Sequence, residues 1–224
     1  MELKRPMGVK IAPSANEIVV RMVAPRNSGG TMASKNIVID AGHGGHDSGA
    51  KYSSGGQTLN EKDFTLAIAK LVSDALSDTG CTVAMTRNDD TFIELPDRPR
   101  VANDSNADFF VSIHINSNQL GNRSGTTTYY HFDNSDSRLL AQCIQAEIAK
   151  ISGIGDYGVV SDRTVAPSKG FSVLRNSRVP AVLVEVAYIN NSIDRRLLQT
   201  EGFRKKVAEA IVRGIKVYIG EQKN

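Results

Sequence analysis

Three residues with acid, base or metal-binding side chains each stand directly after an apolar run. They are His43, His114 and Glu185, which follow the segments 37–42, 109–113 and 181–184. Short apolar runs of this kind predict buried strands. In an α/β sheet, ligands and reactions gather beyond the carboxyl ends of the strands. Two imidazoles and a carboxylate in this position favour a metal-dependent active site over a hydrophobic core.

Imidazole and carboxylate are the ligands of catalytic zinc, which takes three protein ligands and keeps a fourth position for water. A separate carboxylate is then useful as a proton acceptor and donor. None of the four histidines lies in an HExxH or Cys/His motif, so spacing alone is weak support for a metal. Histidines that cap helices or make ordinary hydrogen bonds remain an alternative. The glycines at 42, 44, 45 and 49 predict a tight loop rather than a phosphate site, because no GK[ST] is present.

The elements that must position these residues alternate between strand and helix. Asn60 can cap a helix over residues 61–78 that Gly80 ends, and Thr200 can cap a last helix with an apolar stripe. Strands are expected at 37–40, 81–86, 109–113, 126–131, 171–174 and 181–184, with further helices at 98–106 and 137–151. This alternation predicts an α/β fold with a mixed, mostly parallel central sheet and helices on both faces, in the manner of phosphorylase- and hydrolase-like folds.

Composition limits the class of protein. The chain has 224 residues, 40% of them hydrophobic and 23% charged, which fits a soluble domain with one core. A net charge of +3 is too small to indicate nucleic-acid binding, although it suits an anionic partner such as a bacterial wall. Cys81 and Cys143 are expected to be buried thiols, and a single disulfide between them stays open.

The first 33 residues differ from the rest. Residues 17–23 predict a strand and residues 27–31 a linker, so 1–33 is expected to be an extension, the end of a preceding domain or an added edge strand. Residues 34–220 are then the main domain. No apolar stretch reaches the roughly 20 residues of a membrane span, and the first 25 residues lack the apolar region of an export signal. The chain could still be a piece of an exported protein.

The segment DAGHGGHDSGA at 40–50 closely resembles the opening motif of the zinc-dependent N-acetylmuramoyl-L-alanine amidases of the amidase-3 type. Further motifs that resemble the family follow in the same order: NEK at 60–62, TR at 86–87, LPDR at 95–98, AN at 102–103, ADFFVSIHINS at 107–117, VLR at 173–175 and PAVLVEV at 180–186. Several separated motifs in one order are far more specific than any single motif. The resemblance covers about residues 36–218.

The resemblance implies a role for each matching residue. His43, Glu61 and His114 would bind one Zn²⁺, and Glu185 would be the catalytic carboxylate. The substrate would be peptidoglycan, cut between N-acetylmuramic acid and the first L-alanine of the stem peptide, outside the cytoplasm of a bacterium. A wall-targeting domain or a regulator could lie outside this chain. From the residues alone, Glu61 fits the ordinary preference of acids for a helix start, and Glu185 could form a salt bridge.

His46 and His131 do not fall on ligand positions. His46 is expected in a loop, exposed or at the pocket rim, and His131 at the surface. Only ten residues, 115–124, separate His114 from Gly125, which predicts an open groove without a helical plug. Two alternatives remain: a zinc carboxypeptidase or other peptidase on a related scaffold, and a wall-binding module without catalysis.

Overall fold

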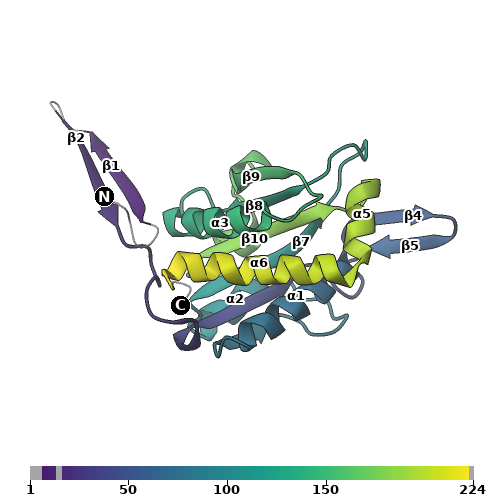
Figure 1. Cartoon of the computed structure of the whole chain (residues 1–224), viewed down its shortest axis with the longest axis horizontal. Helices are drawn as coiled ribbons and strands as arrows, with labels where there is room; N and C mark the ends of the chain where they lie inside the picture. Colours follow the sequence, from purple (N-terminus) through teal and green to yellow (C-terminus); the bar gives the residue numbers. More distant parts are fainter. Residues whose placement is uncertain (1–6, 14–16, 222–224) are drawn as a thin grey trace.

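The computed structural model describes residues 7–13 and 17–221, and a six-stranded sheet forms its centre (Figure 1). In sheet order the strands are β6 (Thr82–Met85), β3 (Asn36–Ala41), β7 (Phe109–Asn116), β10 (Ala181–Tyr188), β8 (Thr126–Tyr130) and β9 (Asp156–Ser161). Neighbouring strands are parallel except β10 and β8. The prediction of a mixed, mostly parallel sheet is confirmed.

Helices cover both faces of the sheet, as predicted, but unequally. The helices α1 (Glu61–Ser77), α3 (Ser135–Ile148) and α6 (Glu201–Ile219) pack on the larger apolar core, and the short helices α2 (Asp97–Asp104) and α4 (Ser172–Arg175) lie on the other face. Because side chains alternate along a strand, Val184 faces the larger core while Leu183 and Glu185 face the thinner side. The thinner side therefore has room for a site.

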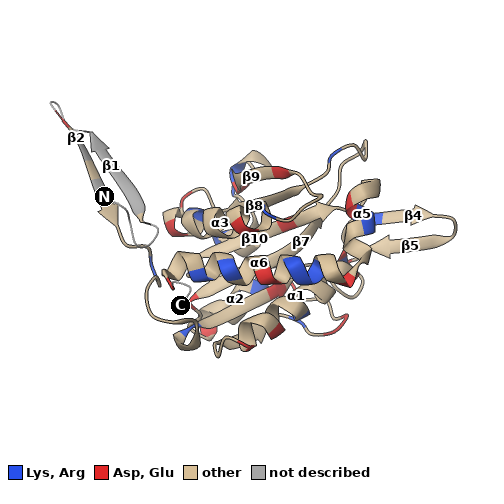
Figure 2. Cartoon of the chain, in the orientation of Figure 1, with Lys and Arg blue, Asp and Glu red and all other residues tan. Residues whose placement is uncertain are grey.

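Helix α6 shows the predicted amphipathic pattern. Its buried side chains include Phe203, Val207, Ile211 and Ile215. Residues of both charges are coloured along α6 in Figure 2, and Lys205, Lys206 and Glu209 among them are exposed. Thr200 accepts a hydrogen bond from the Phe203 amide, which confirms the predicted cap.

Helix α1 begins at Glu61 as predicted, but the Asn60 side chain does not cap it. Instead, Asn60 Nδ2 donates to Asp63 Oδ2 at 3.1 Å. The first amides of the helix donate to backbone carbonyls of the preceding loop, Glu61 to Ala50 at 2.8 Å and Lys62 to Ser48 at 3.2 Å. The start of α1 is thus joined to the loop that follows His43.

Some local predictions were wrong or incomplete. The strand predicted at 171–174 was wrong: Phe171 is the N-cap of helix α4, and residues 172–174 lie in the helix. A short apolar run does not distinguish a strand from a helix. Three further features were not predicted: strand β9, helix α5 (Ser192–Gln199), and the hairpin of β4 (Lys51–Ser54) and β5 (Gln57–Asn60). That hairpin turns at Gly55 and Gly56, both with positive φ, as a two-residue hairpin turn requires.

The predicted N-terminal strand is β2 (Ile18–Val23), which pairs with β1 (Gly8–Pro13) in a separate two-stranded sheet rather than extending the main one (Figure 1). Residues 1–6 and 14–16 of the predicted extension lie outside the described residues. The following linker contacts the main body, since Gly29 N donates to Ile219 O at 2.8 Å and Tyr218 Oη to Arg26 O at 2.7 Å.

Cys81 and Cys143 are both buried and free. The expectation of two buried thiols is thus confirmed. None of the helices within residues 7–13 and 17–221 has the length and apolar character needed to span a membrane.

Candidate metal centre

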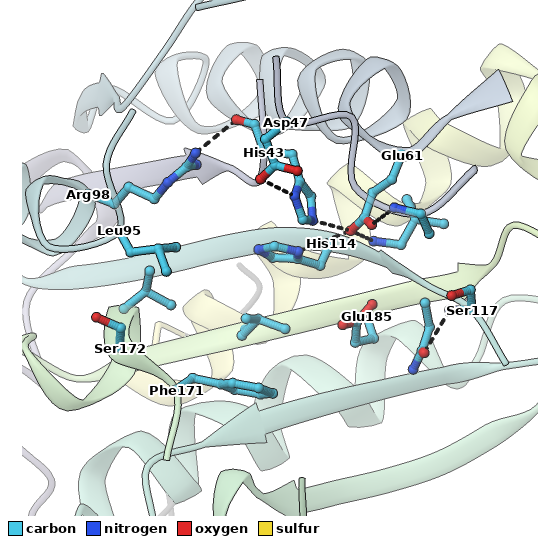
Figure 3. A pocket seen from close by; sticks show the side chains of 15 residues that line it. His43, Asp47, Glu61, Leu95, Arg98, His114, Ser117, Phe171, Ser172 and Glu185 are labelled. Atoms are coloured by element: carbon cyan, nitrogen blue, oxygen red, sulfur yellow. Dashed lines mark hydrogen bonds and ion pairs between the residues drawn. The ribbon is translucent and has the colours of Figure 1, made fainter. Parts of the chain in front are cut away.

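Two of the predicted strand-end residues meet at one point of the sheet, together with Glu61 from the start of α1 (Figure 3). The possible ligand atoms of His43, Glu61 and His114 all lie within 4.8 Å of one another. Glu61 Oε1 is 3.1 Å from His43 Nε2 and 3.0 Å from His114 Nδ1. The third strand-end residue, Glu185, lines the same cavity.

The first ligand stands in a tight loop with unusual backbone geometry. His43 has φ +61°, in the left-handed region that non-glycine residues rarely adopt. Gly44 and Asp47 close the loop with two backbone hydrogen bonds of 2.9 and 3.0 Å. The loop brings Asp47 Oδ2 to 2.8 Å from His43 Nδ1.

This contact assigns the tautomer of His43. Because a carboxylate only accepts hydrogen bonds, the proton of a neutral His43 lies on Nδ1 and leaves a lone pair on Nε2. That lone pair faces Glu61 Oε1 at 3.1 Å, so two acceptors confront each other. A proton or a metal ion between them resolves the conflict. Without metal, burial lowers the pKa of His43 but the neighbouring Glu61 and Asp47 raise it more, so the pKa lies above its ordinary value.

The Glu61 carboxylate is held firmly. Its Oε1 accepts from the Ile115 amide at 2.8 Å, and its Oε2 from the Ala50 amide at 2.8 Å. The side chain is buried, which by itself raises the pKa, but hydrogen bonds to His114 and His43 and their charges bring the pKa well below the usual range. Glu61 is therefore ionised at neutral pH, as a metal ligand must be.

The geometry suits zinc. Zinc–nitrogen and zinc–oxygen bonds of roughly 2.0–2.2 Å in a tetrahedral site place neighbouring ligand atoms about 3.3 Å apart. The Glu61 oxygen lies 3.1 and 3.0 Å from the two imidazole nitrogens. Two histidines and one glutamate are also a known ligand set of catalytic zinc. The residues present thus fit the metal that the sequence predicts.

Two glycines allow this close approach. A Cβ on Gly42 would lie 2.5 Å from the His114 ring, and a Cβ on Gly49 would lie 2.5 Å from Glu61 Oε2 and 2.7 Å from His43 Cδ2. Gly49 also has φ +61°. The glycines of this loop therefore make space for the ligands, in line with the prediction of a shaped loop.

Glu185 has a different environment. It pairs in register with His114 on the neighbouring strand β7. Its Oε2 atom is enclosed and has no hydrogen-bond partner within the described part of the chain. Burial, and next the negative charge of Glu61, raise the pKa of Glu185 well above its ordinary value. The cavity thus holds one firmly ionised glutamate and one that readily keeps a proton.

The cavity has a volume of about 450 Å³ and a two-sided lining. The three possible ligands and Glu185 form the polar side, and the apolar side includes Leu95, Phe171, Val173 and Leu183. Leu95 is 55% exposed at the rim. Residues 115–117, which follow His114, line the cavity rather than fill it.

The other two histidines lie elsewhere. His46 is exposed and rests against the Phe92 ring, with ring centroids 4.2 Å apart, so the loop prediction is confirmed. The prediction of a surface position for His131 was wrong. Its ring is half-buried, with Nδ1 2.9 Å from Oδ2 of the fully buried Asp162. The same oxygen accepts from the Phe171 amide at 2.9 Å, so this pair anchors a loop of the cavity wall.

Sequence reasoning missed the contributions of Asp47 and of two buried arginines, Arg87 and Arg98. Asp47 stands four residues after His43, and both arginines stand in the motifs at 86–87 and 95–98. Residue type alone did not indicate that these three side chains support the site, because arginine and aspartate are ordinarily exposed. The structure instead places both guanidinium groups under the His43 loop.

Comparison with known proteins agrees with the geometry. Residues 37–217 match the N-acetylmuramoyl-L-alanine amidase family. The chain is 40% identical over 186 residues to the uncharacterised protein YqiI of Bacillus subtilis, covering 82% of this chain and 84% of that protein. It is 39% identical to the probable cell wall amidase LytH of Staphylococcus aureus, where the match covers 82% of this chain but 58% of LytH.

Solved structures show the same fold. An N-acetylmuramoyl-L-alanine amidase from Clostridium difficile 630 superposes with a TM-score of 0.77 at 34% identity, over 85% of this chain and all (100%) of that one. The catalytic domain of CwlV, an N-acetylmuramoyl-L-alanine amidase from Bacillus (Paenibacillus) polymyxa, gives 0.75 at 38% identity, over 84% and 99% of the two chains.

Proposed function

The chain belongs to the N-acetylmuramoyl-L-alanine amidase family of peptidoglycan hydrolases, and from this premise we propose how it works. His43 Nε2, Glu61 Oε1 and His114 Nδ1 hold one zinc ion, and Glu185 transfers protons. The observation that carries the proposal is the pair of facing acceptors, His43 Nε2 and Glu61 Oε1, 3.1 Å apart with an imidazole nitrogen beside them.

When bound, zinc supplies the charge that lowers the pKa of a water molecule towards 7 and polarises a carbonyl group. Asp47 holds His43 in the tautomer whose Nε2 lone pair faces the ion, as carboxylates do for metal-binding histidines. Glu61 and the two histidines all line the cavity, where water and substrate would reach the ion.

Glu185 supports general acid–base catalysis. Its carboxylate accepts the proton of the attacking water and then donates it to the amine of L-alanine as the amide bond breaks. Burial and the negative charge of Glu61 raise the pKa of Glu185 above its ordinary value, which favours the protonated form that donation to the amine requires. Its Oε2 has no protein partner within residues 7–13 and 17–221 and is free to take part in this transfer.

The cavity wall supports the proposed substrate. The scissile bond of peptidoglycan joins the lactyl group of N-acetylmuramic acid to L-alanine, and both carry methyl groups. Leu95, Phe171 and Val173 offer apolar contacts opposite the ligands. We assign these side chains to the carbon skeleton on either side of the bond.

We propose that residues 34–220 form the catalytic domain and that 1–33 are an extension to it. The match to the family over 37–217 and the end of α6 at Ile219 support this division. Action on peptidoglycan places the enzyme outside the cytoplasm, in the wall, the periplasm or the medium. Wall-targeting domains or regulators remain partners to be identified.

Digestion of purified sacculi, followed by mass spectrometry, tests the reaction. We expect stem peptides with a free L-alanine amino group and glycan strands with free lactyl carboxylates. Glu185→Gln should abolish most release, while the control Glu209→Gln, an exposed glutamate on α6, should not. Shortened stems still attached to glycan would indicate a peptidase, and binding without any product a wall-binding module; either result would refute the proposal.

A further inference from the structure

The loop that carries His43 rests on two buried guanidinium groups. Arg87 Nε and Arg98 Nη1 both donate to Ala41 O at 2.9 Å. Arg87 Nη2 donates to Gly42 O at 2.9 Å, and Arg98 Nη2 to His43 O at 2.9 Å. Three successive carbonyl groups are therefore held by two side chains that are 4% and 2% exposed.

This loop needs external support because its backbone is strained. His43 adopts φ +61°, a conformation that persists in a non-glycine residue only when its surroundings hold it there. A change to an ordinary backbone conformation would swing the imidazole away from Glu61. The Arg98 bond is made to the carbonyl of His43 itself (Figure 3).

Arg98 is itself fixed in place. Its Nη1 lies 2.9 Å from Oδ1 of Asp40, which is fully buried in strand β3. The same carboxylate accepts from Thr86 Oγ1 and from Ser112 Oγ, both at 2.6 Å. Arg98 Nε donates to Ile93 O at 3.0 Å. The guanidinium fork thus joins a rigid strand to the strained loop.

We propose that Arg98, assisted by Arg87, is a positioning residue that sets the affinity of the site for zinc by holding His43 in its left-handed conformation. The inference rests on the proposed zinc site. A lysine cannot replace this fork, because an ammonium group is a point charge that cannot bond Asp40 and two carbonyls in one plane. Arg98→Lys keeps the charge and removes the geometry.

Ser112→Ala is the matched control. It removes a buried hydrogen bond to the same Asp40 carboxylate but no contact to the His43 loop. If Arg98 is merely structural, both variants lose thermal stability and neither changes metal binding. If Arg98 positions His43, only Arg98→Lys weakens zinc binding.

The test is a zinc titration against a chromogenic chelator, well below the melting temperature of each variant. Loss of an outer contact to a metal ligand typically costs about 10- to 100-fold in affinity, and we expect a loss in this range for Arg98→Lys. Ser112→Ala should match the wild type. Excess zinc should restore activity to Arg98→Lys, and the absorption spectrum of the Co²⁺ form should change, because it reports ligand geometry.

Equal zinc affinity and equal Co²⁺ spectra for Arg98→Lys and the wild type would overturn the inference while leaving the proposed function intact. If Arg98→Lys fails to fold, the same zinc titration and Co²⁺ spectrum of Arg87→Lys test the inference. That variant loses the paired hydrogen bonds from the guanidinium group to Ala41 O and Gly42 O. A wild-type protein that binds no zinc would overturn the proposed function and this inference together.

Discussion

The substitution Glu185→Gln separates an effect on catalysis from an effect on stability, because the carboxylate to which we assign proton transfer is buried beside the negative charge of Glu61. The substitution keeps the shape of the side chain and removes its ability to accept and deliver a proton. General acid–base groups contribute about 10²- to 10⁴-fold to a rate, which is about 2.7–5.5 kcal/mol at ~1.36 kcal/mol per tenfold change. We expect kcat on a soluble muropeptide to fall by this factor, with zinc content unchanged.

Stability should move in the opposite direction. The pKa of Glu185 is raised in the folded protein by burial and by Glu61, so the native state binds more protons than the unfolded state above the ordinary pKa. Wild-type stability is therefore lost as pH rises from the unfolded pKa through the folded pKa. The Gln variant lacks this loss. The metal-free variant should therefore be the more stable protein at pH 8, and its advantage should grow by about 1.36 kcal/mol for each pH unit between the unfolded and the folded pKa of Glu185.

Thermal melts of metal-free wild type and Glu185→Gln at pH 4 and pH 8 check this. Each kcal/mol corresponds to about 2–4 °C in Tm for a chain of this size. The two proteins should melt together at pH 4 and separate at pH 8, with the variant higher. Wild-type kcat in the variant, or a Tm difference that does not grow with pH, would refute the roles assigned to Glu185.

Three further substitutions and one chemical test follow from the same geometry. Asp47→Ala should weaken zinc binding about 10-fold or more, since it removes the acceptor that fixes the His43 tautomer, and chelator competition measures this. Gly42→Ala puts a methyl group 2.5 Å from the His114 ring; we expect about 1–3 kcal/mol of destabilisation in denaturant melts and loss of bound zinc, and a stable, fully loaded variant would show that the ring yields freely. Leu95→Asp should raise KM with little change in kcat, because Leu95 lines the cavity, is 55% exposed and is not one of the possible ligands; an unchanged KM would show that this side chain does not contact the substrate. Burial raises the pKa of Cys143 to about 12 and that of Cys81 above its usual value, so neither thiol should react with a disulfide reagent at pH 8 until the protein unfolds.

The residues that could be predicted from sequence are those that stand at the ends of buried strands. His43, His114 and Glu185 follow apolar runs, and parallel strands bring such ends to one edge. The hydrophobic pattern did not predict which of these residues would bind the metal and which would transfer protons. Glu61 reads as an ordinary acid at a helix start, and only the resemblance to a family pointed to it as a ligand.

What escaped prediction depends on contacts between distant segments. Residues 171–174 read as a strand because they are short and apolar, yet residues 172–175 form a helical turn whose N-cap, Phe171, donates its amide to the distant Asp162. His131 reads as a surface residue because its partner Asp162 is 31 positions away. The support of His43 by Arg98, 55 positions later, leaves no local signal either.

Metal analysis of the purified protein tests the assignment of His43, Glu61 and His114 most directly. Wild type and Glu185→Gln should each carry one zinc ion per chain after purification without chelator, and Glu61→Gln should carry little or none. A wild-type protein without zinc, or a Glu61→Gln variant with as much zinc as the wild type, would contradict the site described here.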